Sequence, residues 1–229
     1  MSDLWKRLRF VLGCIIVYRI GTHIPIPGID PVRVSSLFDQ NQGTILELFN
    51  LFSGGALERM SIFALNVVPY ISAAIIMQLF SNAIPYLIEL KKEGQAGRNA
   101  ITQYTRYGTV ALAFVQASAL AVTLSSSGLA YNPGTSFFVT AVFTVVAGTV
   151  FLMWLGEQIS ERGIGNGISI IIATSILTGI PGAIGQALEQ ARQGDLNILM
   201  LLSIGVLAMV VIAIVAVSYT HLTLPTSTH

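Results

Sequence analysis

The chain has 229 residues, of which 53% are hydrophobic and only 10% are charged, with 12 Lys and Arg against 11 Asp and Glu. A water-soluble domain usually carries about 25% charged residues. This composition therefore excludes a disordered chain, a nucleic-acid-binding domain and an ordinary soluble enzyme, and it indicates a protein embedded in lipid. The single cysteine, Cys14, excludes disulfides and cysteine-based metal sites within the chain.

The N-terminal segment is the least regular candidate for a membrane span, because Arg19 and His23 interrupt its apolar residues. Basic residues precede it, as they do in a signal peptide. No small-x-small cleavage site follows, however, which favours an uncleaved first span over a signal peptide.

The rest of the chain has long uncharged stretches. Four of them contain no Asp, Glu, Lys or Arg: 60–88, 107–156, 163–188 and 196–229. A membrane-spanning helix needs about 20 mostly apolar residues, and in lipid such a run is helical because the backbone must satisfy its own hydrogen bonds. The second stretch is long enough for two helices and has turn-forming residues at 125–128 and 132–134, which predicts a helical hairpin.

The sequence therefore predicts an all-α polytopic membrane protein with about six transmembrane helices. The predicted spans are 8–26, 62–84, 104–125, 135–156, 167–186 and 196–217. Pro69 lies inside the second span and predicts a kink or break there.

Basic residues are distributed unequally between the two sides of the membrane. Eight lie on the side of the N-terminus, namely Lys6, Arg7, Arg9, Lys91, Lys92, Arg98, Arg106 and Arg162; three lie on the other, namely Arg33, Arg59 and Arg192. Because cytoplasmic loops carry the excess of Lys and Arg, the N-terminus is predicted to be cytoplasmic. Topology alone explains the basic loop 91–98 with its flexible glycines, which could also face anionic lipid or a cytoplasmic partner.

Residues 44–63 are apolar enough to be buried but too short, and too interrupted at Gly54 and Gly55, to cross a membrane. The spacing alone favours an amphipathic helix at the outer interface. The alternative is a short re-entrant helix in a pore, since a broken segment lies at membrane depth only where protein or a water-filled cavity surrounds it.

No group of residues indicates catalysis, a metal site or a cofactor. The glycine-rich run 163–167 follows a membrane span rather than a buried strand, so it predicts a tight turn rather than a nucleotide-binding loop. Glu157 and Glu161 predict a solvated ion cluster with Arg162. Intramembrane charge is limited to Arg19, which argues against an ion-coupled pump.

Eight runs of residues occur in an order that is characteristic of one family. They are Tyr18–Gly21, Ile24–Asp30, Phe49–Leu57, Val68–Ser72, Lys91–Gly94, Gln103–Gly108, Trp154–Ile159 and Arg162–Ser169. Together they resemble bacterial SecY, the channel-forming subunit of the Sec protein translocase. The resemblance covers roughly residues 5–217 and implies a clamshell of helices in two pseudo-symmetric halves, of which this chain would supply the first half and the sixth helix.

The resemblance implies a cytoplasmic N-terminus (1–9), an N-terminal half-channel (10–186) with five transmembrane helices, and an outer loop with the sixth helix (187–217). The segment of about 44–61 matches the family's plug, which overturns the interfacial-helix interpretation. The plug residues are Phe49, Asn50, Phe52, Ser53, Gly54, Gly55 and Leu57. The tail 218–229 is uncharged and unlike the family; we expect a foreign or truncated reading frame there, and a fragment that forms no closed channel by itself.

An apolar pore ring is also implied, with Val67 and Ile71 in the second span and Ile168 and Ile172 in the fifth. Bulky aliphatic side chains at a constriction fit around a passing polypeptide and offer ions no replacement for their hydration shell. The second span matches one wall of the lateral gate. The implied function is to move unfolded preproteins across the bacterial cytoplasmic (inner) membrane, and membrane segments laterally into it, without an enzymatic step.

The partners implied are the SecE and SecG subunits, the SecA ATPase or the ribosome, signal-sequence-bearing preproteins and membrane lipid, with no cofactor and no direct nucleic-acid contact. The cytoplasmic partner would meet Lys91, Lys92, Arg98 and Arg106. The residues also leave open a secondary transporter for a small solute, since broken helices serve those folds too, and a membrane scaffold with small-residue packing faces.

Overall fold

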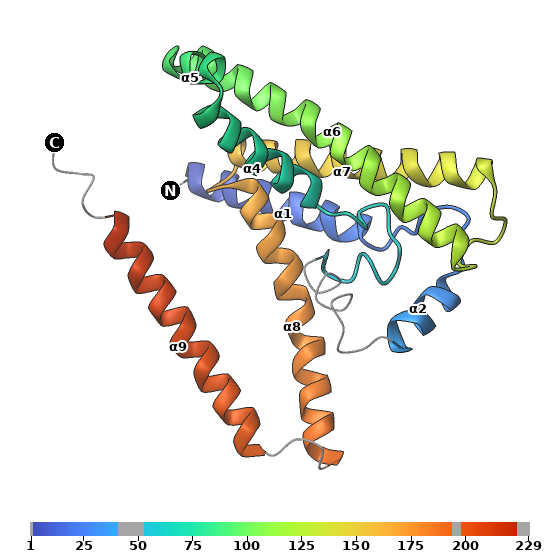
Figure 1. Ribbon diagram of the computed structural model, residues 1–229. Helices are drawn as coiled ribbons and strands as arrows, with labels where there is room; N and C mark the ends of the chain where they lie inside the picture. Colours follow the sequence, from blue (N-terminus) through green and yellow to red (C-terminus); the bar gives the residue numbers. More distant parts are fainter. Residues whose placement is uncertain (1, 41–52, 194–197, 224–229) are drawn as a thin grey trace. The chain divides into compact units, whose positions relative to one another are not determined.

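Helices make up most of the described chain. The computed structural model describes residues 2–40, 53–193 and 198–223, and within these ranges it contains helices and no strand (Figure 1). The chain divides into two compact units, Met1–Gly179 and Ile180–His229. The helices are α1 (Ser2–Gly21), α2 (Pro31–Gln40), α4 (Val68–Ala83), α5 (Pro85–Lys92), α6 (Gln95–Ser126), α7 (Thr135–Arg162), α8 (Gly167–Gln193) and α9 (Ile198–Thr223).

A helix lies at each of the six predicted spans, which confirms the all-α architecture for the described chain. Among these helices, α6 and α7 are long and apolar enough to cross a membrane, and α4 with α5 forms a third such segment if the bent pair is taken as one span. The helices α8 and α9 contain shorter apolar stretches, Gly167–Gly182 and Leu202–Ser218. The ends differ from the prediction, since α1 already begins at Ser2 and α9 extends into the tail, to Thr223.

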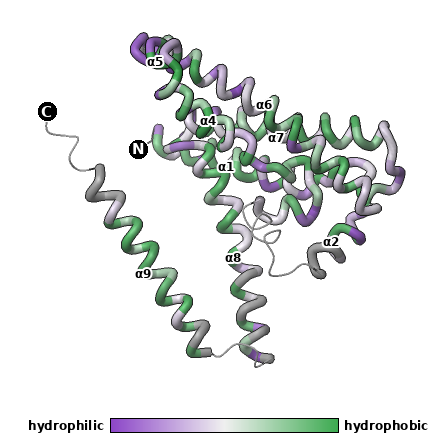
Figure 2. The backbone as a smooth tube through the Cα atoms, in the orientation of Figure 1, coloured by the Kyte–Doolittle hydropathy of each residue, from purple (hydrophilic) through white to green (hydrophobic). Residues whose placement is uncertain are grey.

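The predicted hairpin is formed by α6 and α7. Every fourth residue along one face of α6 is small and buried: Thr105, Thr109, Ala113, Ala117 and Ala121. Small side chains at this spacing let neighbouring helices approach closely, and α6 packs against both α7 and α4. Figure 2 shows that both helices of the hairpin are predominantly hydrophobic.

The prediction that Pro69 breaks the second span is wrong. The helix α4 begins at Val68, so Pro69 lies in its first turn, where a missing N–H group costs no helical hydrogen bond. The break is at the other end of α4, where Ile84 is extended and Pro85 begins α5. The two helices are bent by 94° there, because a proline disfavours helical backbone in the residue before it.

The basic segment 91–98 is a sharp corner between α5 and α6 rather than a flexible loop, since only residues 93–94 lie outside the two helices. Gly94 has a φ of 72°, a left-handed conformation that favours glycine. A Cβ added at Gly97 would lie 1.6 Å from the carbonyl oxygen of Leu90. Both glycines are therefore needed for the corner itself.

The run 163–167 is the predicted tight turn, between α7 and α8. Gly165 has a φ of 73°. The side-chain oxygen of Asn166 accepts a hydrogen bond from the Ser169 backbone N–H at 3.2 Å, which is how an asparagine satisfies the first turn of a helix.

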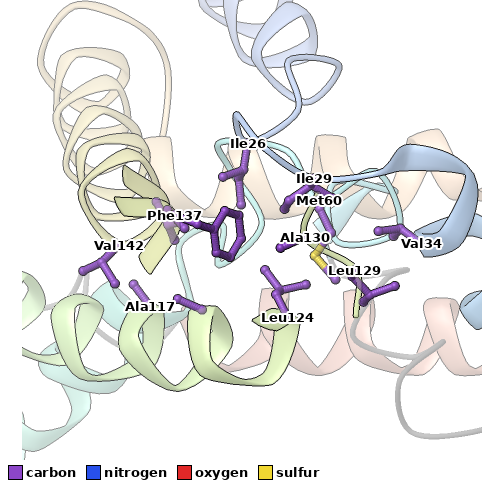
Figure 3. Packing of buried hydrophobic residues seen from close by; sticks show 13 residues of the cluster. Ile26, Ile29, Val34, Met60, Ala117, Leu124, Leu129, Ala130, Phe137 and Val142 are labelled. Atoms are coloured by element: carbon purple, nitrogen blue, oxygen red, sulfur yellow. The ribbon is translucent and has the colours of Figure 1, made fainter. Parts of the chain in front are cut away.

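A packing centre, which we call the turn cluster, joins the α6–α7 turn to the segment between α1 and α2 (Figure 3). The backbone N–H of Asp30 donates to the Leu129 carbonyl at 3.0 Å, and that of Tyr131 donates to the Gly28 carbonyl at 3.0 Å. The buried residues of the cluster are Ile26, Ile29, Val34, Met60, Ala117, Ala121, Leu124, Leu129, Ala130, Phe137, Ala141, Val142 and Val145.

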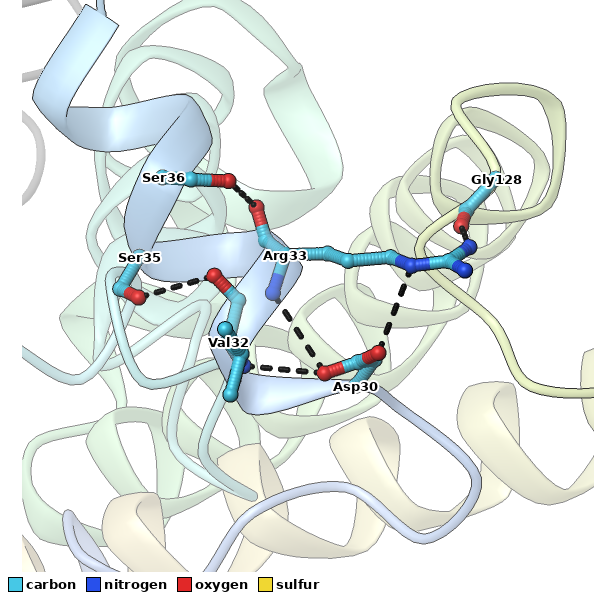
Figure 4. A network of polar contacts seen from close by, with 6 residues as sticks. All are labelled: Asp30, Val32, Arg33, Ser35, Ser36 and Gly128. Carbon is cyan, nitrogen blue, oxygen red and sulfur yellow. Dashed lines mark hydrogen bonds and ion pairs between the residues drawn. The ribbon is translucent and has the colours of Figure 1, made fainter.

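Asp30 caps α2 beside this cluster (Figure 4). Its Oδ1 accepts hydrogen bonds from the backbone N–H groups of Val32 at 3.0 Å and Arg33 at 3.4 Å. The Arg33 guanidinium lies 3.4 Å from Asp30 Oδ2 and donates to the Gly128 carbonyl at 2.9 Å.

We expect Asp30→Ala to lower the free energy of unfolding by about 1 kcal/mol, because a capping oxygen is lost. Asp30→Asn keeps that oxygen and should retain most of the stability, since the exposed Arg33 ion pair contributes little. Thermal unfolding in detergent measures the difference. Equal losses in both variants would show that the charge, rather than the cap, matters.

Candidate functional site: an anchored plug segment

The predicted plug residues Phe49, Asn50 and Phe52 lie outside the described residues. The described end of this segment, residues 53–61, is called here the plug exit. Most of it forms turns rather than a helix. Gly54 and Gly55 have φ values of 66° and 79°, so the glycine pair does interrupt the segment, as the sequence predicts.

Two neighbouring residues near the end of α1 hold the plug exit by its backbone. The Tyr18 hydroxyl donates to the Ser53 carbonyl oxygen at 3.3 Å, and Arg19 Nη1 donates to the Gly54 carbonyl oxygen at 3.1 Å. Arg19, the one charge predicted inside the membrane, is therefore stabilised by a carbonyl dipole of the plug exit.

Helix α8 completes the anchor through Ser175. Its Oγ lies 2.5 Å from the Tyr18 hydroxyl and accepts a hydrogen bond from Asn66 Nδ2 at 3.2 Å. Either hydroxyl can be the donor between Tyr18 and Ser175, and the Ser175 Oγ also lies 2.9 Å from the Ile171 carbonyl oxygen, which can accept its proton. We call Tyr18, Arg19, Asn66 and Ser175 the plug latch.

The latch is enclosed by apolar side chains. Tyr18 is 1% exposed and Ser175 is 0% exposed, and a hydrogen bond between buried groups is costly to break when one partner is left unsatisfied. Asn66 has a φ of 49°, a conformation that asparagine adopts more readily than most residues. The backbone before α4 is therefore shaped so that Asn66 reaches α8.

Gly54 lies directly against α8. A Cβ added there would lie 3.2 Å from the Ser175 Cα and carbonyl oxygen and from Thr178 Oγ1. Glycine is thus required at this position for two reasons: its positive φ, and the close approach of its backbone to α8.

A second tether holds the far end of the plug exit. The backbone N–H of Ile26 donates to the Met60 carbonyl at 2.8 Å, and that of Ile62 donates to the Ile24 carbonyl at 2.9 Å. Met60 also belongs to the turn cluster. The plug exit is therefore fixed to the segment after α1 at one end and to the latch at the other.

A second group of buried side chains, the central cluster, includes Tyr18 of the latch. The aromatic ring of Phe63 stacks on two others. Its centroid lies 6.0 Å from that of Tyr18 and 6.0 Å from that of Phe151. Its buried residues are Val11, Cys14, Tyr18, Ala56, Phe63, Val67, Leu152, Leu155, Ile159 and Ile171.

All four predicted ring residues lie at this central cluster. Val67 is one of its members, and Ile71, Ile168 and Ile172 pack against it. Val67 and Ile71 are one turn apart at the start of α4, as Ile168 and Ile172 are at the start of α8, so each pair shares a helix face. Val67 is only 2% exposed, whereas the other three are partly exposed.

All four predicted partner-facing cations are exposed, and one of them, Arg106, is in an ion pair. Arg106 Nε lies 2.7 Å from Glu157 Oε1, an ion pair that joins α6 to α7. The predicted cluster of Glu157 with Arg162 is therefore corrected: the partner of Glu157 is on the neighbouring helix. Lys91, Lys92 and Arg98 lie around the α5–α6 corner and are exposed.

Sequence reasoning missed Tyr18, Asn66 and Ser175 as site residues. A signal was present for each, since a polar side chain among apolar residues needs a partner when it is buried. The partner's identity depends on the fold, because Tyr18 and Ser175 are 157 positions apart.

Comparisons with known proteins agree with one another. The SecY family model matches residues 61–228. A protein translocase subunit SecY from Pseudomonas aeruginosa is 61% identical over 215 residues, which cover 94% of this chain and 49% of that protein. The chain thus spans about half the length of this curated relative.

Two solved structures have a similar fold. One, of a protein-conducting channel, has a TM-score of 0.65 and 21% identity, over 92% of this chain and 47% of the other. A second, which concerns the plug domain of SecY, has a TM-score of 0.58 and 21% identity, over 85% and 42%. None of these relatives supports a small-solute transporter. With 61% identity over nearly its whole length and a family match over most of it, the chain belongs to the SecY family.

Proposed function

We propose that this chain supplies the first half of a protein-conducting channel in the bacterial cytoplasmic membrane, with its N-terminus in the cytoplasm and residues 44–61 as the plug. The observation that carries this proposal is the attachment of the plug exit to both α1 and α8. Membership of the SecY family and the excess of basic residues on the N-terminal side support it.

In the resting channel, the latch holds the plug exit by a few hydrogen bonds. Each typically contributes about 0.5–1.5 kcal/mol net, or about 1.5–3 kcal/mol when one partner is charged. The summed free energy of these hydrogen bonds keeps the plug in place, yet it is small enough for an entering polypeptide to displace the plug. Gly54 and Gly55 allow the backbone to change direction during this movement.

The ring closes the pore together with the plug in the resting channel, and it seals around the polypeptide while the plug is displaced. Val67, Ile71, Ile168 and Ile172 would contribute this half of it, and the second half of the channel would pack on the side where Ile71, Ile168 and Ile172 stay partly exposed. Apolar side chains there resist wetting and give ions no ligands. Helix α4 would form one wall of the lateral gate.

The driving energy comes from partners, since the channel makes and breaks no covalent bond. We propose SecA or the ribosome on the cytoplasmic side, SecE and SecG as companion subunits, and signal-sequence-bearing preproteins as cargo. Lys92, next to the α5–α6 corner, and the other exposed cations of that corner would face the cytoplasmic partner.

A chimera tests this function. Residues 1–217 of this chain replace the corresponding half of the Pseudomonas aeruginosa relative, and the purified channel is reconstituted with SecE, SecG, SecA and ATP. We expect a signal-sequence-bearing preprotein to become protected from protease inside the vesicles. A chimera that assembles with its companion subunits but moves no preprotein would contradict the proposal.

In the same chimera, glycine at all four predicted ring positions should raise the resting ion conductance in planar bilayers. We expect an increase of about tenfold or more, which corresponds to a barrier lower by roughly 1.4 kcal/mol. Val115→Gly with Val122→Gly is the control, because both side chains are exposed on α6. A conductance as low as that of the control would remove the ring assignment.

A further inference from the structure

His23 joins the end of α1 to the plug exit. It follows the last turn of α1 and is exposed, and its Nε2 lies 3.1 Å from Arg59 Nη1 of the plug exit. We propose that this contact is an acid-sensitive clamp, which holds the plug exit while His23 is neutral and opens when His23 gains a proton. The clamp can be tested without transport, and only its consequence for the channel rests on the proposed function.

Two hydrogen-bond partners of His23 fix which ring nitrogen carries the proton. Nδ1 lies 2.8 Å from the Arg19 carbonyl oxygen, which can only accept, so Nδ1 is the donor. An arginine side chain has donors and no acceptor, so Nε2 is the unprotonated nitrogen that accepts from Arg59. The clamp therefore requires the neutral imidazole with its proton on Nδ1.

Protonation of His23 removes the clamp for two reasons. The acceptor at Nε2 becomes a donor, so it can no longer bind an arginine N–H group. An arginine guanidinium stays charged throughout the physiological pH range, so two like charges would then face each other across the contact with Arg59. Histidine is suited to such a switch, because it is the side chain that ordinarily changes charge between about pH 5 and pH 8.

The two segments that meet at the clamp are residues 15–23 and the plug exit, and besides His23 their charged side chains are Arg19, Glu58 and Arg59. The Arg19 guanidinium is turned to the Gly54 carbonyl oxygen, to which it donates at 3.1 Å. Glu58 precedes Arg59 in the plug exit, and both are exposed. Glu58 is therefore the carboxylate whose titration must be separated from that of His23.

Backbone hydrogen bonds carry the loss of the clamp to the other end of the plug exit. The N–H of Arg59 donates to the Gly55 carbonyl at 3.3 Å. The N–H of Ala56 donates to the Ser53 carbonyl at 3.4 Å. Arg59 also lies over Gly55, where an added Cβ would be 3.7 Å from Nη2. Because these turns follow one another directly, we expect Arg59 and the buried Ser53 to move together when the plug exit detaches.

Thiol modification of the 229-residue chain in detergent tests the clamp. The reporter is Ser53→Cys in a chain with Cys14→Ala, because residue 53 is buried while the plug exit is attached. Each rate is divided by that of the unfolded chain at the same pH, which removes the effect of thiol ionisation. We expect the normalised rate to rise about two- to fivefold between about pH 8 and pH 5, the effect of one exposed polar interaction.

Three variants make the test specific to His23. His23→Gln keeps an acceptor for Arg59 but does not titrate, so its normalised rate should stay low at both pH values. His23→Lys carries a charge at both pH values and should give the high rate at both. Replacement of the two other histidines, His221 and His229, by Gln is the matched control and should leave the acid response intact.

An acid response that persists in His23→Gln and disappears in Glu58→Gln would assign the titration to the carboxylate and overturn the proposal. A normalised rate that does not change with pH in the chain with His23 would overturn it as well. Failure of the chimera to move a preprotein contradicts the proposed function but leaves the clamp intact, because the clamp is measured in the absence of transport.

Discussion

Gly148→Ala is expected to lower the free energy of unfolding by about 1–3 kcal/mol, the usual cost of an overpacked core. Gly148 lies on α7, and a Cβ there would be 2.0 Å from the Ile62 carbonyl oxygen and 3.2 Å from the Phe63 ring. The backbone that follows the plug exit must therefore move away from α7 to admit one methyl group. Denaturant unfolding in detergent measures the loss.

Gly13→Ala is the matched control for this substitution. Gly13 is also a glycine inside a helix, but a Cβ there would have no atom within 4 Å. Alanine should be neutral or stabilise α1 by roughly 0.5–1 kcal/mol, because glycine loses more backbone entropy on folding. If the two variants behave alike, α7 and the residues after the plug exit do not pack as described.

Tyr18→Phe is expected to loosen the plug exit by about 1–2 kcal/mol, because the Ser53 carbonyl loses a buried donor and Ser175 loses a buried hydrogen-bond partner. A change of this size raises the population of the open form by a factor of about 5–30. The rate at which a thiol reagent modifies Ser53→Cys, with Cys14 replaced by Ala, reports this population, since residue 53 is buried when the latch is closed.

Two further variants make the latch prediction specific. Tyr131→Phe removes a hydroxyl from a side chain that is 63% exposed and should leave the modification rate unchanged. Ser175→Ala should speed modification, and its combination with Tyr18→Phe should be non-additive, since contacting residues usually couple by about 0.5–3 kcal/mol. Strict additivity would mean that Tyr18 and Ser175 act separately.

The helices that were predictable from sequence owe their form to local properties. The hairpin of α6 and α7 follows from the uncharged stretch 107–156 and the turn residues inside it, and the composition of a membrane helix decides most of its structure. The start of α4 was not predictable in this way. Asn66 takes its left-handed conformation where its side chain meets Ser175, which is 109 residues away.

The candidate site was predictable only in part, for the same reason. The glycine pair indicated an interrupted segment, because glycine has a low helix propensity wherever it occurs. The residues that hold this segment come from α1 and α8, so their pairing depends on the folded arrangement.

The attachment of Met60 to the Ile26 backbone limits how far the plug can travel. If the latch opens while this pairing persists, Ser53 stays connected to Met60 by seven residue steps, which span at most roughly 25 Å when fully extended. That length is slightly less than the hydrocarbon thickness of a bilayer, about 30 Å. A displaced plug would thus remain tethered by a short segment of chain. It would stay close enough to the pore to close it again without first diffusing back to it.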